Sequence, residues 1–189
     1  MTTKENPWTI SNVLSLSRIV LMGPVVYFFL SSMPHHREYA VLFLLIAVTT
    51  DALDGYFARL LHQESELGKV IDPLADKIGV GIVVVLLLFF GDIPFWFALL
   101  IVARDFLIFL GGLYIRKRTG LILPSNMPGK LAVSFVALTL TLSIVHYRIF
   151  SALETISFWI SVTLLVYSFV VYTRRFIAVL AADKNKPRL

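Results

Sequence analysis

The sequence predicts an all-α polytopic membrane protein with six transmembrane helices. Of its 189 residues, 58% are hydrophobic and only 15% are charged, whereas soluble domains carry roughly 25% charged residues. The apolar residues come in long runs, and about 20 mainly apolar residues make one membrane-spanning helix. There is no cysteine, so disulfides and thiolate metal sites are excluded. We expect a single membrane domain over residues 1–189.

Six apolar runs account for the predicted spans. Polar stretches over residues 31–38 and 62–69, a tight turn at Gly91-Asp92-Ile93-Pro94 and a basic loop over residues 116–130 separate them. The tail from Ala181 is expected to be frayed. Several ionisable residues fall inside the second, third and fourth runs, which is unusual beside a bilayer. The predicted spans are residues 10–30, 39–61, 70–90, 95–114, 131–145 and 156–180.

The positive residues predict how these spans are oriented. Loops on the cytoplasmic side carry an excess of Lys and Arg. On one side of the predicted topology only Arg37 and Arg148 occur. Both termini and the loop over residues 62–69 are therefore predicted to be cytoplasmic. The residues on that side are Lys4, Arg59, Lys69, Arg116, Lys117, Arg118, Lys130, Arg174, Arg175, Lys184 and Lys186.

The formal net charge of +5 is expected to favour membrane lipids as partners. Its positive residues flank apolar runs instead of forming a solvated stripe, so a nucleic-acid partner is not expected. Anionic lipid headgroups at the cytoplasmic surface attract basic segments of this kind. The predicted location is therefore a membrane, crossed several times.

Four carboxylates stand out within this apolar sequence. Asp51 and Asp54 are three residues apart, and Asp72 and Asp76 are four apart. On a helix, each spacing puts both side chains on one face. Clustered carboxylates repel one another unless a cation lies between them, and all-oxygen ligands suit Mg²⁺, Mn²⁺ or Ca²⁺. The alternative, ordinary polar residues at helix ends, is disfavoured because ionisable groups beside membrane spans usually serve a function.

The residues around these aspartates resemble a known signature. The pattern D-x-x-D-G-x-x-A-R, eight residues, then G-x-x-x-D-x-x-x-D covers residues 51–76. It is similar to the signature of the CDP-alcohol phosphatidyltransferases, integral membrane enzymes of phospholipid synthesis. The resemblance implies that Asp51, Asp54, Asp72 and Asp76 hold two divalent ions, Mg²⁺ or Mn²⁺. It also implies that Asp76 is the base that takes a proton from the attacking alcohol while CMP leaves CDP-diacylglycerol.

Small residues in the signature point to close approach of another group. Gly55 lies within a predicted helix, where glycine costs about 1 kcal/mol relative to alanine. Either a neighbouring membrane helix packs there or a nucleotide lies against the backbone. The resemblance implies a cytidine site lined by Gly55, Ala58 and Gly68 and completed by Asp51 and Asp54. It also implies that Arg59 binds the phosphates; the alternative is a membrane anchor.

Three basic residues are candidates for binding the acceptor. Arg104 lies near the middle of a span, where an unpaired arginine costs several kcal/mol. The adjacent Asp105 is expected to pair with it poorly, because successive helical side chains point about 100° apart. Lys130 opens the fifth span and Arg18 lies near the same face, so Arg18, Arg104 and Lys130 are predicted to bind a second anion. These three cations favour an acceptor that carries its own phosphate. The alternative is that Arg104 has a purely structural role.

The segment Asp72-Pro73-Leu74-Ala75-Asp76-Lys77 narrows the resemblance. It looks like the D-P-x-A-D-K variant found in phosphatidylglycerophosphate synthases and the related cardiolipin synthases. The expected reaction is transfer of a phosphatidyl group from CDP-diacylglycerol to sn-glycerol 3-phosphate, by a homodimer in a bacterial inner membrane. Cardiolipin synthase is favoured by the basic run Arg116-Lys117-Arg118 and by the pair Arg104-Asp105. Chain length favours the glycerophosphate enzyme instead.

Other activities stay open at this point. Phosphatidylglycerol is the acceptor if the chain makes cardiolipin, and an inositol phosphate is the acceptor in other members of the family. A further alternative is a protein that binds CDP-diacylglycerol but does not catalyse its turnover. A membrane cation-binding or transport protein is the non-enzymatic alternative, but it would need charges spread through the bilayer depth. The four aspartates cluster instead near one predicted face.

Overall fold

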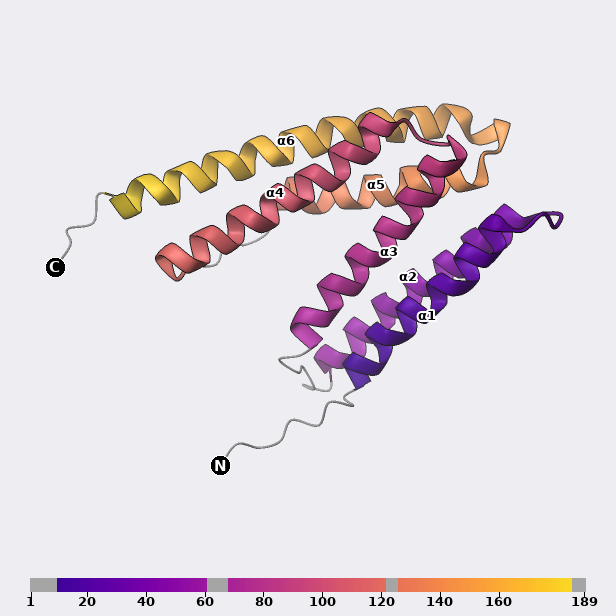
Figure 1. The fold of residues 1–189 in the computed structure, drawn as a ribbon, viewed down its shortest axis with the longest axis horizontal. Helices are drawn as coiled ribbons and strands as arrows, with labels where there is room; N and C mark the ends of the chain where they lie inside the picture. The colour runs from indigo at the N-terminus through magenta and orange to yellow at the C-terminus, as the bar shows by residue number, and fades with distance from the viewer. Residues whose placement is uncertain (1–9, 61–67, 122–125, 185–189) are drawn as a thin grey trace. The chain divides into compact units, whose positions relative to one another are not determined.

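The computed structural model describes the backbone of residues 10–60, 68–121 and 126–184, and the side chains of residues 20–50, 77–121 and 126–183. Within these ranges the chain is helical and has no strand, as predicted (Figure 1). The chain divides into two compact units, Met1–Asp92 and Ile93–Leu189. The helices are α1 (Ile10–Leu30), α2 (His36–Leu60), α3 (Gly68–Phe90), α4 (Phe95–Thr119), α5 (Met127–Val145) and α6 (Ser151–Lys184), with a 3₁₀ turn η1 (Arg148–Phe150) before α6.

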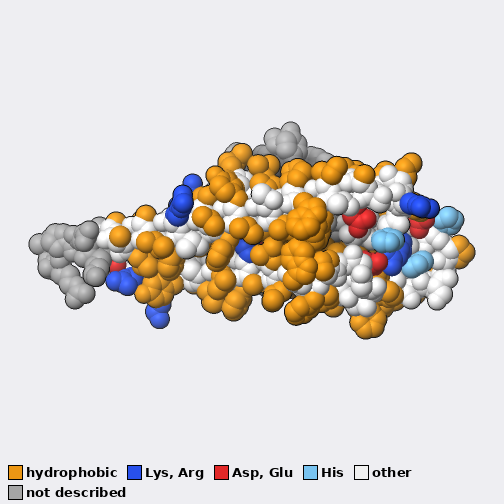
Figure 2. Space-filling view, turned by 90° about the horizontal axis from the view of Figure 1, so that it is seen from above, with side chains coloured by type: hydrophobic (Ala, Val, Ile, Leu, Met, Phe, Trp, Pro, Cys, Tyr) orange, Lys and Arg blue, Asp and Glu red, His pale blue; other side chains and the backbone are white. Residues whose placement is uncertain are grey.

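Three helical segments of the described chain are long and apolar enough to cross a membrane. They are α4, α5 and the continuous stretch Arg148–Asp183. Shorter apolar helical segments, Val20–Leu30 and Lys77–Phe90, lie in α1 and α3. Hydrophobic side chains cover much of the face seen in Figure 2, and exposed apolar side chains are what a lipid-facing surface needs. A membrane protein with several apolar helices is therefore supported, while six spans remain a prediction.

In the first unit, α1 packs against both α2 and α3. Val25 and Phe29 of α1 and Leu87 of α3 are fully buried. The end of the unit is held by Arg37, at the start of α2, and Asp92, just after α3. Two parallel contacts of 3.1 Å join their guanidinium and carboxylate groups, and the guanidinium carbon lies 5.3 Å from the centre of the Phe29 ring. Such a bidentate pair fixes geometry as well as charge.

The predicted tight turn after the third span is confirmed. Gly91 has a φ of 77°, a left-handed conformation that glycine adopts without the steric cost of a Cβ. Its amide donates to the carbonyl of Leu88 at 3.2 Å, and the Asp92 amide donates to that of Leu87 at 2.8 Å. These bonds end α3, and Pro94, in an extended conformation, directly precedes the first residue of α4.

In the second unit, α5 and α6 run antiparallel and meet through buried hydroxyl groups. The hydroxyl of Thr139 lies 3.0 Å from that of Ser157 and 2.9 Å from that of Ser161. All three residues are at most 1% exposed. Small and hydroxylated side chains let membrane helices approach closely and hydrogen-bond to one another. This contact was not predicted, because isolated serines in an apolar run carry no signal of their own.

The hydroxyl contact leads to a prediction about stability. Thr139→Val keeps the shape of the side chain but removes its hydroxyl group, so we expect a loss of about 0.6 kcal/mol, and at most about 1.7 kcal/mol, in the free energy of unfolding. Unfolding in detergent with increasing denaturant would measure the change. Thr163→Val is a matched control, because the Thr163 hydroxyl donates only to the carbonyl of Trp159 in its own exposed turn. An equal loss in both variants would contradict the interhelical contribution.

The helices α4 and α6 run parallel along a seam with small residues on the α4 side. The hydroxyl of Tyr172 donates to the carbonyl of Ile108 at 2.9 Å. A Cβ on Gly111 would lie 3.4 Å from the Tyr172 and Phe176 rings, and a Cβ on Gly112 would lie 3.3 Å from the Tyr172 hydroxyl. The two glycines thus let the aromatic side chains of α6 lie against the backbone of α4.

Several predicted boundaries in the second unit were wrong. The basic run at residues 116–118 was placed in a loop, but it forms the last turn of α4, where cations interact favourably with the helix dipole. The fifth helix begins at Met127 instead of residue 131, because Asn126 caps it and Pro128 fits its first turn. The tail predicted to fray at Ala181 continues as helix to Lys184, and Asp183 pairs with Arg118 at 2.9 Å.

Candidate active site

The signature residues lie on two successive helices of the first unit. The backbone of residues 51–59 belongs to α2, and that of Asp72 and Asp76 belongs to α3. The prediction that each pair of aspartates lies on a helix is therefore confirmed. Gly68 is the first residue of α3, two residues before the predicted start of the third span. The side chains of Asp51, Asp54, Ala58, Arg59, Asp72 and Asp76 lie outside the described residues, so their metal, nucleotide and catalytic roles stay predictions, as does the role of Gly55 and Gly68.

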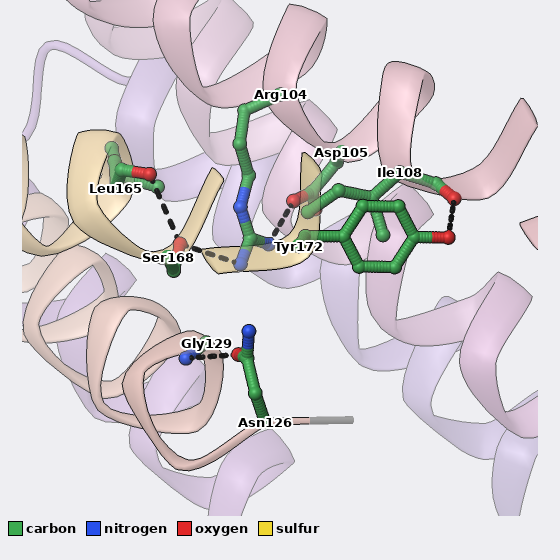
Figure 3. Close-up of polar contacts among 8 residues, drawn as sticks. All are labelled: Arg104, Asp105, Ile108, Asn126, Gly129, Leu165, Ser168 and Tyr172. Carbon is green, nitrogen blue, oxygen red and sulfur yellow. Dashed lines mark hydrogen bonds and ion pairs between the residues drawn. The ribbon is translucent and has the colours of Figure 1, made fainter. Parts of the chain in front are cut away.

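Arg104 is held by two partners within the second unit (Figure 3). Its Nη1 donates to Asp105 Oδ1 at 2.7 Å, and its Nη2 donates to the hydroxyl oxygen of Ser168 on α6 at 2.9 Å. The side chain is only 10% exposed. The expectation that Asp105 pairs poorly with Arg104 was wrong. The long arginine side chain bends back to its neighbour, because an unpaired guanidinium is costly in apolar surroundings.

The first turn of α5 lies beside the Arg104 guanidinium. The Asn126 side chain accepts a hydrogen bond from the amide of Gly129 at 2.7 Å, which caps the helix. A Cβ on Gly129 would lie 3.1 Å from Arg104 Nη2 and 2.5 Å from Asn126 Oδ1. Glycine therefore leaves the space that the arginine occupies. Lys130 follows directly and its side chain is exposed.

The electrostatics of this arrangement favour an anion. The N-terminus of α5 carries the positive end of the helix dipole, and the Arg104 guanidinium adds a full positive charge. Asp105 offsets part of it, but the Asp105 side chain is 35% exposed and is therefore less enclosed than Arg104. The Arg104 Nε is buried and has no hydrogen-bond partner among the described residues. A guanidinium in this position can bind an anion that displaces Asp105.

The other predicted basic residues have separate outcomes. Arg18 lies in α1, and its side chain is outside the described residues, so its convergence with Arg104 and Lys130 stays a prediction. Arg118 is engaged by Asp183 and by the hydroxyl of Tyr114 at 3.1 Å. The contact with Asp183 ties the end of α4 to α6, whereas the contact with Tyr114 lies within α4. Ser168 and Asn126 were not singled out from the sequence, although Asn126 before Met127-Pro128 is a recognisable helix-capping pattern.

Comparison with known proteins decides the family. The profile described as CDP-alcohol phosphatidyltransferase matches residues 8–167. The chain belongs to the CDP-alcohol phosphatidyltransferase family. Membership in this family makes the chain an enzyme, a transferase of phospholipid biosynthesis that works at a membrane.

Individual relatives fall in two groups within the CDP-alcohol phosphatidyltransferases. A CDP-diacylglycerol–glycerol-3-phosphate 3-phosphatidyltransferase of Aquifex aeolicus is 34% identical over 87% of this chain and 93% of its own length. An enzyme with the same name from Bacillus subtilis is 40% identical, over 51% of this chain and 49% of its own length. The human cardiolipin synthase (CMP-forming) is 40% identical over 61% of this chain and 38% of its own length.

Proposed function

We propose that this enzyme transfers the phosphatidyl group of CDP-diacylglycerol to sn-glycerol 3-phosphate and so forms phosphatidylglycerophosphate and CMP. The observation that carries the proposal is the match to the Aquifex aeolicus enzyme, which extends over 93% of that protein. The matches to the Bacillus subtilis and Rickettsia bellii enzymes of the same name support it.

Cardiolipin synthesis is the second candidate. Relatives named cardiolipin synthase from human and rat are 40% and 38% identical over 61% of this chain. The Arg104-Asp105 pair is also similar to the pair in cardiolipin synthases. These matches cover less than two fifths of the relatives' own lengths, 38% and 37%. The longer match therefore favours glycerol 3-phosphate over phosphatidylglycerol.

The four aspartates fit a pair of divalent ions by their donor chemistry. Each helix supplies two carboxylates at helical spacing, and carboxylate oxygens are preferred ligands of Mg²⁺ and Mn²⁺. Two such ions, when bound, would neutralise charge on the pyrophosphate and on the departing CMP. Asp51, Asp54, Asp72 and Asp76 would hold them. The proposal also keeps the nucleotide residues as predicted, with Gly55, Ala58 and Gly68 at the cytidine and Arg59 at the phosphates.

The chemical step is a substitution at the lipid-linked phosphorus. The glycerol hydroxyl oxygen forms a bond to that phosphorus, and the bond from phosphorus to the oxygen of CMP breaks. Asp76 takes the proton that the hydroxyl loses. Positioning and charge neutralisation supply most of the rate enhancement in phosphoryl transfer. The helical backbone supports these roles because Asp72 and Asp76 lie about one turn apart along α3.

The acceptor phosphate is proposed to bind Arg104, with Lys130 and Arg18 as further cations. The supporting observation is that the nine-tenths buried guanidinium lies against the first turn of α5, one residue before Lys130. A phosphate monoester carries more charge than the Asp105 carboxylate and can accept a bidentate pair from arginine. We expect it to replace Asp105 at Nη1 while Ser168 keeps its contact with Nη2.

An acceptor panel tests the proposed function directly. Purified protein in mixed micelles is given radiolabelled CDP-diacylglycerol and Mg²⁺ or Mn²⁺, with glycerol 3-phosphate, phosphatidylglycerol, inositol 1-phosphate or serine. Turnover with glycerol 3-phosphate, releasing CMP and a lipid with two phosphates, is the expected result. Turnover with phosphatidylglycerol alone would make the enzyme a cardiolipin synthase. Binding of CDP-diacylglycerol without turnover of any acceptor would contradict an enzymatic role.

The proposed location is a bacterial inner membrane, with six spans and both termini in the cytoplasm, and a homodimer is proposed from the family resemblance. The chain has no cysteine, so introduced cysteines report unambiguously. We expect single cysteines at His36 and Gln63 to react with a membrane-impermeant maleimide from opposite sides of the membrane, with the Gln63 position on the cytoplasmic side. Reaction of both from one side would refute the six-span arrangement.

A further inference from the structure

We propose that Ser168 is a positioning residue that sets the Arg104 guanidinium for the acceptor phosphate. The inference rests on the proposed function, since it takes Arg104 as a contact of the acceptor. It adds a residue of α6 that the signature does not contain. Ser168 would act through Arg104, without touching the substrate itself.

The hydrogen bonds around Ser168 have a defined direction. Its hydroxyl donates to the carbonyl of Leu165 at 3.0 Å, which leaves the oxygen free to accept from Arg104 Nη2 at 2.9 Å. Ser168 is fully buried, with 0% exposure, so water cannot readily replace this acceptor. Figure 3 shows the guanidinium directed at the serine hydroxyl, with Asn126 and Gly129 on the side of α5.

Ser168 and Asp105 hold Arg104 in different ways. Asp105 carries a charge and is 35% exposed, so an incoming anion can compete with it for the guanidinium and has room to displace it. The serine hydroxyl is neutral, buried and anchored to the backbone of its own helix, so an anion has no reason to displace it. The serine can therefore keep one end of the guanidinium in place while the carboxylate exchanges with phosphate.

A fixed guanidinium matters because arginine side chains lose considerable rotamer entropy when they are ordered. If Ser168 orders Arg104 before the substrate arrives, binding of the acceptor does not have to bear that cost. The cost of ordering one such side chain corresponds to roughly a two- to tenfold change in an equilibrium constant. Ser168→Ala should therefore raise the KM for glycerol 3-phosphate by about two- to tenfold and leave the KM for CDP-diacylglycerol unchanged.

Ser161 provides a matched control on the same helix. It is also a fully buried serine, and its hydroxyl donates to the carbonyl of Ser157 at 2.7 Å and contacts Thr139 at 2.9 Å. These two partners, Ser157 and Thr139, lie on α6 and α5, and neither hydrogen bond involves Arg104. Ser161→Ala should lower the thermal stability in detergent to a similar extent as Ser168→Ala, without changing either KM.

The deciding experiment is a double-mutant cycle with Arg104→Gln, Ser168→Ala and the double variant, in which both KM values are measured. If Ser168 acts through Arg104, Ser168→Ala has no further effect on the acceptor KM once Arg104 is glutamine. Ser168→Thr keeps the hydroxyl group and is expected to restore much of the wild-type acceptor KM. Residual Ser168→Ala effects in the Arg104→Gln background would overturn the positioning role.

The remaining outcomes separate this inference from the proposed function. If Arg104→Gln raises the acceptor KM but Ser168→Ala does not, the positioning role fails and the proposed acceptor contact stands. If Arg104→Gln leaves the acceptor KM unchanged, the acceptor contact fails together with the inference. If the wild-type enzyme turns over phosphatidylglycerol instead of glycerol 3-phosphate, the proposed function fails. The same cycle, run with phosphatidylglycerol, then still decides whether Ser168 acts through Arg104.

Discussion

Asp54→Ala and Asp72→Ala are each expected to reduce turnover to less than about one thousandth of the wild-type rate. Each substitution removes a predicted ligand of a divalent ion, and an ion at a transferring phosphoryl group supplies several kcal/mol of stabilisation, with each 1.36 kcal/mol worth a factor of ten in rate. The CMP released from CDP-diacylglycerol, measured with saturating glycerol 3-phosphate, would report the loss. Circular dichroism and size-exclusion chromatography in detergent should stay as in the wild type.

Removal of the metal should have the same effect without any substitution. Treatment with EDTA is expected to stop turnover, and an excess of Mg²⁺ or Mn²⁺ should restore it. Asp183→Asn is a suitable control, because Asp183 pairs with Arg118 at the end of α6 and lies outside the signature. It should retain its activity. Undiminished turnover in EDTA would be incompatible with a metal-dependent mechanism.

Arg104→Gln should raise the KM for glycerol 3-phosphate by roughly ten- to a hundredfold. A charge-assisted hydrogen bond lost from a partly dehydrated site costs about 1.5 to 3 kcal/mol, and 1.4 kcal/mol is a factor of ten in affinity. The KM for CDP-diacylglycerol should change far less, because Arg59 and the aspartates are proposed to hold that substrate. Initial rates with each substrate varied in turn would measure both constants.

Asp105→Asn breaks the same ion pair from the other side. It removes the carboxylate that competes with the acceptor phosphate for Arg104 Nη1, so the KM for glycerol 3-phosphate should stay unchanged or fall. If Asp105→Asn raises this KM as much as Arg104→Gln does, the intact ion pair is what matters, and Arg104 is a structural residue. Equal losses toward both substrates in Arg104→Gln would likewise end its assignment to the acceptor.

The sequence predicted the helices better than it predicted the contacts between them. Apolar runs located all six helices, because long stretches of lipid-compatible residues leave the backbone no other way to satisfy its hydrogen bonds. Helix ends were less accurate. The basic run at residues 116–118 was assigned to a loop, yet it lies in α4. Charged side chains at the membrane surface are compatible with a continuing helix.

At the site, the residue types were predictable and the partners were not. The carboxylate spacing and the mid-span arginine are visible in the sequence, because charge is costly in apolar surroundings. The partner of a buried arginine depends on which turn of a distant helix lies opposite, and Ser168 is 64 residues away from it. The prediction that Asp105 pairs poorly with Arg104 failed because it ignored the flexibility of the arginine side chain. Successive side chains leave a helix about 100° apart, but the long, flexible side chain of arginine can bend across that angle.

The parallel seam between α4 and α6 limits how the length of α6 in this chain can change. Three contacts along it keep nearly the same separation in sequence, because their partners are 64, 64 and 65 positions apart. One residue inserted into α6 after Ser168 would turn the rest of the helix by about 100° and advance it by 1.5 Å. Tyr172 and Asp183 would then lose their partners together. Insertions and deletions are therefore expected between α4 and α5, outside the helices. The length of α6 is expected to stay constant.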